Sequence, residues 1–179
     1  SEGYLITPET LQYGNYTLVE TKAPYGYVLD ATPIPFSINE GNATIDNALL
    51  ITKVTKEDMA QKGTITVTKT GEIFTSVNQS GEVYQPVWAT GNLSGATFTV
   101  TAAEDIITPD GTLRYAAGTV VDTITTGSNG TATSIPLYLG KYNVVETEVP
   151  EGMIANDAVY SVELTYAGQE VEVTNTDLS

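Results

Sequence analysis

Three residues with complementary chemistry recur at the same place in short alternating segments. Lys69, Glu146 and Asn175 each end a segment in which apolar and polar residues alternate, and each shares the face of the two apolar residues before it. The segments are 63–69, 141–146 and 170–175. Alternation with a period of two is typical of half-buried β-strands. The pattern therefore predicts an amine, a carboxyl and an amide directed into a protein interior.

These three groups could react with one another if they share one interior. Burial lowers the pKa of a lysine and raises that of a glutamic acid, so a dry core favours a neutral amine and a protonated carboxyl. A neutral amine is a nucleophile, and a carboxylic acid can polarise a nearby carboxamide. Attack of Lys69 on the side chain of Asn175, with Glu146 as the acid, would release ammonia and leave a Lys–Asn amide.

A simpler interpretation applies to each residue on its own. A lysine at the end of a strand usually extends its amine into water, and a terminal glutamate is usually solvated. The position of these residues on the apolar face of an alternating segment is therefore not enough to predict a cross-link, which needs further support.

An internal repeat supplies that support. Residues 11–26 align without a gap with residues 137–152, 126 positions later, and eight of sixteen positions are identical. Both copies keep the pattern Glu-Thr-x-x-Pro-x-Gly. Self-similarity of this kind indicates tandem structural units. Glu20 is then the counterpart of Glu146, and Asn47, which follows Ile45, is a candidate acceptor in the first unit. Its lysine would precede Ser1, so no bond is expected there.

The repeated segments resemble a known family. The pattern Gly-x-Tyr-x-x-x-Glu-Thr-x-x-Pro-x-Gly resembles the "E-box" of collagen-adhesin B-type (Cna B-type) domains of Gram-positive pilins and adhesins. Residues 66–70 resemble the family's first strand, 93–98 its second, and 125–130 the turn before the E-box hairpin. The family forms spontaneous intramolecular isopeptide bonds. The resemblance implies Lys69 as nucleophile and Glu146 as catalytic acid; the acceptor is Asn175 or an Asn or Asp after Ser179.

Composition restricts the other classes of function. The chain of 179 residues carries 22 acids and 7 bases, a net charge of −15, with neither cysteine nor histidine. Nucleic acid and anionic membranes repel such a surface. Disulfides, zinc sites and histidine catalysis are unavailable to it. No segment is apolar enough to insert in a membrane, and no metal or cofactor is expected. Asp105, Asp110 and Asp122 lack the spacing of a calcium loop and are interpreted as turn or surface residues.

The fold expected is all-β. Short alternating segments separated by Gly-, Asn- and Pro-containing turns predict an antiparallel β-sandwich, and the resemblance implies an immunoglobulin-like or prealbumin-like form. Residues 1–61 are expected to be the carboxy-terminal part of a first unit whose amino-terminal strands are absent. Residues 62–179 are expected to be a second, nearly complete unit, whose final strand either ends this sequence or follows Ser179. Residues 76–82 are expected at a hairpin tip.

The function expected is that of a structural stalk module in an extracellular, cell-wall-anchored adhesin or pilin-like protein, with neighbouring repeats as partners. The alternative is an adhesin module that recognises a host glycan or protein through loops at one end of the sandwich, or through Trp88, Tyr84 and Tyr115. A glycosidase with two carboxylates is a third hypothesis. Beyond a single self-reaction, no enzyme activity is expected. Unpaired strands in the first unit predict strand-swapped self-association.

Overall fold

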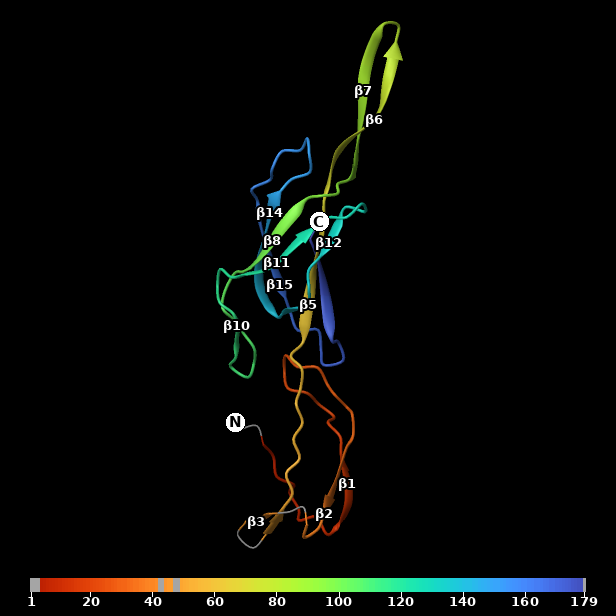
Figure 1. The fold of residues 1–179 in the computed structure, drawn as a ribbon. Coiled ribbons are helices and arrows are strands. Elements are labelled where there is room, and N and C mark those ends of the chain that lie inside the picture. Colours follow the sequence, from red (N-terminus) through yellow and green to blue (C-terminus); the bar gives the residue numbers. More distant parts are fainter. Residues whose placement is uncertain (1–3, 42–43, 47–48, 179) are drawn as a thin grey trace.

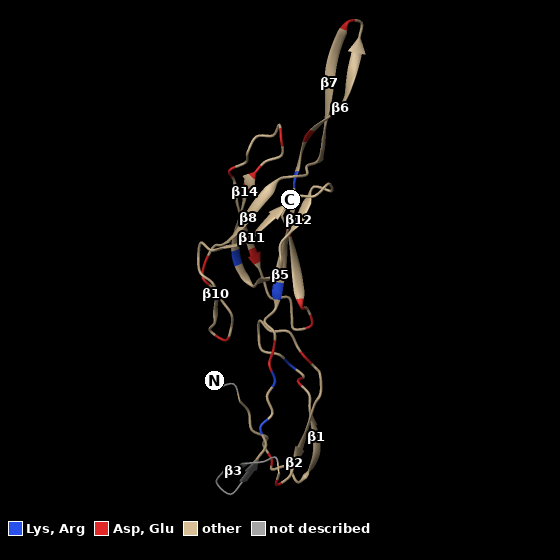
Figure 2. Ribbon diagram, viewed as in Figure 1, with Lys and Arg blue, Asp and Glu red and all other residues tan. Residues whose placement is uncertain are grey.

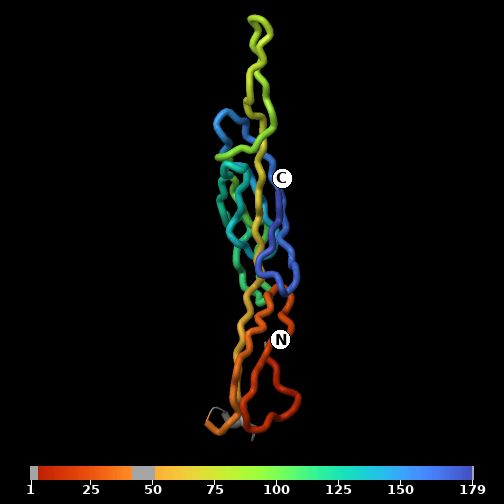
Figure 3. The backbone as a smooth tube through the Cα atoms, turned by 90° about the vertical axis from the view of Figure 1, so that its right-hand side faces the viewer, coloured from red at the N-terminus to blue at the C-terminus, as the bar shows by residue number. Residues whose placement is uncertain are grey.

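The computed structural model describes residues 4–41, 44–46 and 49–178. Over these residues the chain is all-β, with strands, turns and irregular segments and no helix. The molecule is long and narrow: the amino-terminal part lies at one end, a β-sandwich in the middle, and a two-stranded hairpin extends from the far end (Figures 1 and 3). Among the described residues, none forms a helix that could cross a membrane.

The sandwich consists of two sheets. In the first sheet the strand order is β11-β8-β14-β15. In the second, β5 lies between β12 and β13 on one edge and β16 on the other. The bounds are β5 Lys62–Thr68, β8 Thr97–Ala102, β11 Val120–Thr125, β12 Thr131–Thr133, β13 Leu137–Tyr138, β14 Gly140–Glu148, β15 Val159–Leu164 and β16 Val173–Leu178. Two short strands, β9 (Ile106–Ile107) and β10 (Leu113–Tyr115), form a small hairpin beside it.

Alternation in the sequence builds the core between the sheets. Strands β5, β8 and β14 each alternate buried with less buried residues, so each contributes one apolar face. The pairing departs from the expected antiparallel pattern at one place, because β16 runs parallel to β5. The buried apolar residues form one cluster: Ile65, Val67, Ala96, Phe98, Val100, Ala102, Ile106, Ile124, Ala132, Leu137, Tyr142, Val144, Val162 and Leu164.

The amino-terminal part contains two small hairpins. β1 (Gly14–Leu18) pairs with β2 (Ile34–Ile38), and β3 (Thr44–Asp46) pairs with β4 (Leu49–Ile51). The β1–β2 register equals that of β14–β15 at the repeat offset: Gly14 faces Ile38, and Gly140 faces Leu164. The correspondence supports the proposed repeat, and the domain boundaries at residues 61 and 62 remain a prediction.

A hydrogen-bonded junction joins the two parts. Gln61, just before β5, is 1% exposed. Its side-chain amide donates to the carbonyls of Gly168 (2.7 Å) and Val171 and accepts from the Ala167 N–H (2.8 Å). Across the same junction, the Gln169 side-chain oxygen accepts from the Ala23 N–H at 2.9 Å. These bonds fix the turn that precedes β16 against the start of β5.

The hairpin at the far end consists of β6 (Thr70–Ser80) and β7 (Val83–Asn92). It turns at Gly81 and Glu82, within the segment predicted as a tip, and Gly81 has φ +63°. The ribbon begins directly after β5 and projects away from the sandwich (Figure 1). Its residues are almost all exposed. The sequence therefore predicted the position of the turn, whereas the length of the projecting ribbon was not predicted.

Candidate functional site

Lys69 and Glu146 meet inside the sandwich. The Lys69 Nζ lies 2.9 Å from the Glu146 Oε2, and the side chains are 19% and 1% exposed. Lys69 directly follows β5 in one sheet, whereas Glu146 belongs to β14 in the other. The pair thus joins the two sheets. The structure brings the predicted amine and carboxyl together; the chemical roles assigned to them remain a prediction.

The backbone holds Lys69 on both sides. Its N–H donates to the Gly130 carbonyl at 2.8 Å, and its own carbonyl accepts from the Leu93 N–H at 3.0 Å. Gly130 has φ +73°, and a Cβ there would lie 2.8 Å from the Lys69 carbonyl oxygen. Only glycine combines this left-handed conformation with so close an approach. The turn at residues 127–130 therefore clamps the lysine at the end of its strand.

The carboxyl of Glu146 is only partly satisfied. Its Oε2 accepts from Lys69 and, at 3.4 Å, from the Asn156 N–H. Its Oε1 is buried and has no hydrogen-bond partner. A buried polar atom without a partner destabilises a fold by about 1–3 kcal/mol.

Asn175 does not join this pair, so the prediction that it faces inward was wrong. Asn175 is exposed and lies opposite Thr64; its Oδ1 accepts from the hydroxyls of Thr64 (2.9 Å) and Thr66 (2.8 Å). Lys69 is five residues beyond Thr64, about 17 Å along the strand. On β16 the half-buried positions are instead Thr174, Thr176 and Leu178.

The reason is the register of β16. Because side chains alternate with a period of two, an odd shift in pairing exchanges the two faces of a strand. The turn at Gly168 is tied to Gln61, and this tie starts the parallel pairing with Val173 opposite Lys62. A tertiary contact at residue 61 thus sets the face of Asn175, and the local pattern could not reveal it.

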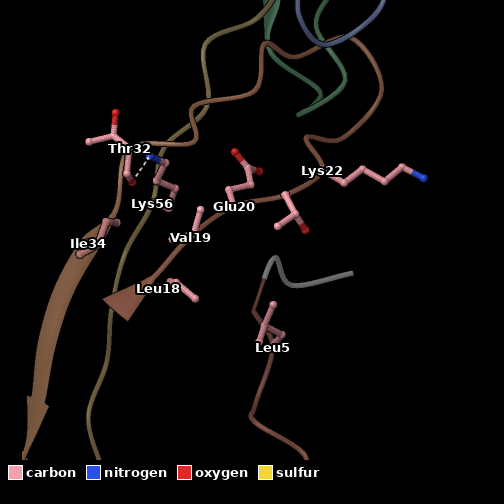
Figure 4. Close-up of a pocket in the computed structure, with 9 residues that line it drawn as sticks. Leu5, Leu18, Val19, Glu20, Lys22, Thr32, Ile34 and Lys56 are labelled. Carbon is pink, nitrogen blue, oxygen red and sulfur yellow. Dashed lines mark hydrogen bonds between the residues drawn. The ribbon is translucent and has the colours of Figure 1, made fainter. Parts of the chain in front are cut away.

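In the amino-terminal part, Glu20 lies beside a different set of charges. It borders a hollow of about 310 Å³ between β1, β2 and the segment before β5 (Figure 4). Its Oε2 is buried without a partner. Burial raises the pKa of Glu20, and the neighbouring Asp58 carboxylate raises it further. Lys56 instead pairs with Asp30, Nζ to Oδ2 at 2.5 Å. Asn47 lies outside the described residues.

A family comparison identifies the fold. The model of the family described as "SpaA: Prealbumin-like fold domain" matches residues 1–53 and 88–177, most of the chain. The chain belongs to this family. No curated protein matches the sequence significantly.

Two solved structures of longer proteins are similar to this prealbumin-like chain. The Bacillus anthracis TIE protein is 24% identical over 94% of this chain and 25% of its own, with a TM-score of 0.55. The T6 backbone pilin of serotype M6 Streptococcus pyogenes is 22% identical over 66% of this chain and 21% of its own, with a TM-score of 0.34. Only the first likeness is close enough to compare folds. The chain spans about a quarter of the TIE protein's length.

The aromatic residues singled out in the sequence do not form one patch. Trp88 and Tyr84, 55% and 65% exposed, lie on the projecting hairpin. Tyr115 is half-buried beside the sandwich and contacts the Tyr138 ring, with centroids 5.8 Å apart. The family match omits residues 54–87, which include all of β6 and half of β7. The same gap contains all of β5, which belongs to the sandwich.

The three aspartates considered for calcium serve separate turns. Asp110 accepts from the Thr108 hydroxyl and the Thr112 N–H, Asp105 from the Ala117 N–H, and Asp122 from the Ile135 N–H. These hydrogen bonds lower the pKa of Asp110. Within the described ranges, no cluster of three or more metal-binding side chains occurs.

Sequence analysis missed Gln61 and the Lys56–Asp58 segment. Both lie in residues 52–62, a charged stretch with few apolar residues. The available signal was the alternation of Lys56 and Asp58 on one face, which the structure places against Glu20 and Asp30.

Proposed function

We propose that this chain is a structural stalk module of an extracellular, cell-wall-anchored adhesin or pilin-like protein. The narrow shape, with two parts in line, and membership of the prealbumin-like family support a load-bearing role. The observation that carries the proposal is the Lys69–Glu146 pair, which links the strand entering the sandwich to a central strand of the opposite sheet.

The pair would take part in a single self-reaction. The Nζ of Lys69 would attack the Cγ of an asparagine side chain, so that the Nζ–Cγ bond forms and the Cγ–Nδ2 bond breaks. Glu146 would carry a proton from Nζ to Nδ2, and ammonia would leave. One lysine and one carboxamide give one isopeptide and one ammonia, and no oxidant is needed.

The acceptor depends on the register of β16. Asn175 would reach Lys69 if β16 paired five residues further along β5, which would also turn Val171 and Val173 inward opposite Ile65 and Val67. In the register described, the inward position opposite Lys69 is the second after Leu178. An Asn or Asp there, in a longer chain, would be the acceptor instead. These alternatives make different predictions for this chain.

The bond would strengthen a stalk by closing a covalent loop. A tie between Lys69 and an acceptor on β16 would join the first and last strands of the sandwich, so pulling the ends could not separate them. By analogy with a disulfide that closes about a hundred residues, the unfolded state would lose entropy worth roughly 4–5 kcal/mol.

Intact-mass measurement of the purified fragment tests the reaction. If Asn175 is the acceptor, the mass is lower than the sequence mass by one ammonia, and both Lys69→Arg and Glu146→Gln restore the full mass. Lys141→Arg, an exposed lysine on β14, is the matched control and keeps the lower mass. The full sequence mass in the parent fragment excludes Asn175 as the acceptor.

An adhesin role is the second candidate. The loop after β14 leaves Ile154 93% exposed at the end of the sandwich, where a host glycan or protein could contact it. Binding of the fragment to a glycan array or to matrix proteins, lost on Ile154→Asp, would support this role. Equal binding by the variant would exclude this loop.

A further inference from the structure

The β6–β7 hairpin has an unusual distribution of apolar residues. Trp88, Pro86 and Tyr84 alternate along β7 and therefore share a face, and the register places Phe74 opposite Trp88 and Val77 opposite Pro86. Phe74 and Trp88 touch edge to face with centroids 5.8 Å apart. The exposed fractions of Phe74, Val77, Tyr84 and Trp88 lie between 48% and 65%. One face of the ribbon is thus an uncovered aromatic stripe.

Its edges are also open. Within the described part of the chain, β6 and β7 pair only with each other. A lone two-stranded hairpin is marginally stable in water. Natural sheets protect open edges with proline, lysine or other charged residues. β7 carries Pro86, but residues 73–80 of β6 contain neither proline nor charge. A bulge lies between Phe74 and Ser76, so the regular unprotected edge is Ser76–Ser80.

The hairpin carries far fewer charged residues than the rest of the molecule. The whole chain has a net charge of −15, yet only Glu72 and Glu82 are charged in residues 70–92. Figure 2 shows the acids concentrated in the body, with the ribbon almost free of charge. Two molecules of this charge repel if their bodies approach. The ribbon projects beyond the body, so two ribbons can meet while the bodies stay apart (Figure 1).

We propose that the hairpin is a self-association element, in which β6 of one molecule pairs antiparallel with β6 of a second copy near Asn78. The two ribbons then form a four-stranded sheet about a two-fold axis, and their aromatic stripes become one continuous face. Pro86 prevents β7 from offering an equivalent edge. The pairing needs neither the isopeptide bond nor a swapped strand, so it goes beyond the stalk function.

The first test measures the mass of the full fragment in solution across a concentration series. Light scattering after size exclusion should give a mass that rises from one copy towards two. The dimer fraction should rise with sodium chloride, because salt screens repulsion between the bodies. A mass of one copy at every concentration and salt level overturns the proposal, whether or not the hairpin then binds a glycan or another protein.

Matched variants locate the contact. Val77→Lys places a charge on the aromatic face beside the pairing edge and should abolish the dimer. Val159→Lys places the same charge on β15, the edge strand of the sandwich, and should leave the dimer intact. Val77 lies outside the core, so both variants should keep the parent melting temperature. Equal dimer formation by the two variants excludes the hairpin.

Cysteine scanning identifies the strand. The chain has no cysteine, so each substitution introduces a single thiol. Single cysteines at residues 76–80 of β6 should include at least one that forms a disulfide-linked dimer in air, because residues at the two-fold axis face their own copies. Gln85→Cys, directly opposite Asn78 on β7, is the control and should stay monomeric. Cross-linking through Gln85→Cys but not through β6 overturns the proposed edge.

Discussion

Lys69 and Glu146 form an ion pair in which Nζ lies 2.9 Å from Oε2. The lysine side chain is 19% exposed to solvent, whereas the glutamate side chain is 1% exposed. The two partners are therefore unequal. Loss of the lysine leaves a buried carboxyl with no cation, whereas loss of both leaves an apolar site between Phe98 and Val144. This asymmetry decides how variants of the pair should behave.

Lys69→Met should destabilise the sandwich by about 3–5 kcal/mol, the usual consequence of leaving a buried charge unpaired. The double variant Lys69→Met/Glu146→Leu should recover most of that loss if the parent contains only an ion pair. If the parent is cross-linked, the double variant stays destabilised, because the covalent loop is lost in both. Urea unfolding measures the difference, with Lys62→Met as control. A loss below 0.5 kcal/mol in the single variant, the size typical of exposed pairs, would contradict the buried geometry.

Two equivalent tyrosines allow a comparison between the two parts of the chain. The Tyr142 hydroxyl donates to the Tyr138 carbonyl at 2.5 Å, and the Tyr16 hydroxyl donates to the Gln12 carbonyl at 2.8 Å. Burial raises the pKa of Tyr142, which is fully buried, whereas Tyr16 is partly exposed. Tyr142→Phe should cost about 1–2 kcal/mol, because it leaves a carbonyl unsatisfied away from water. Tyr16→Phe should cost less, because water can replace the hydroxyl. Equal losses in urea unfolding would show that burial does not matter here.

The sequence predicted those parts of the fold that local alternation controls. Ile65, Val67 and Lys69 share a face, as do Tyr142, Val144 and Glu146, because each strand has only one apolar set to bury. The all-β class and the prealbumin-like family follow from the same repeated patterns.

Residues 171–178 illustrate where this reasoning fails. Val171, Val173 and Asn175 form one alternating set, and Thr174, Thr176 and Leu178 form another of similar character. Contacts made by Gln61, more than a hundred positions earlier, select the second set. Prediction fails for a different reason at the hairpin. Phe74 and Trp88 are residue types typical of a core, yet they project from the sandwich. No local pattern in the sequence distinguishes exposed aromatic residues of this kind from buried ones.

The stability of the folded chain should depend on pH through the raised pKa of Glu20. Burial and the Asp58 carboxylate raise the pKa of Glu20 above its ordinary value of 4.5, so the folded chain holds this proton more tightly than the unfolded chain. The contribution of Glu20 to stability is therefore greatest below pH 4.5 and falls as the pH rises through the folded pKa. Glu20→Gln should raise the melting temperature at pH 7 and have little effect at pH 4. The exposed Glu9→Gln is the control. A larger gain at pH 4 than at pH 7 would reverse the assigned direction.

Gln61 should control both the junction and the register of β16. Gln61→Ala removes three hydrogen bonds from a side chain that is 1% exposed and leaves the Ala167 N–H without its partner. The loss should be about 2–3 kcal/mol, from a cavity together with an unsatisfied buried donor. Gln169→Ala removes the acceptor for the Ala23 N–H and an exposed hydrogen bond to the Glu170 carboxylate, so it should cost less and should loosen the two parts relative to each other. Urea unfolding measures the first effect, and small-angle X-ray scattering measures the second as a broader distribution of molecular lengths.

Because the Gln61 contacts hold Asn175 on the outer face, Gln61→Ala should also speed any appearance of the ammonia-deficient mass. If the chain loses ammonia equally fast with and without Gln61, the register of β16 does not depend on this glutamine.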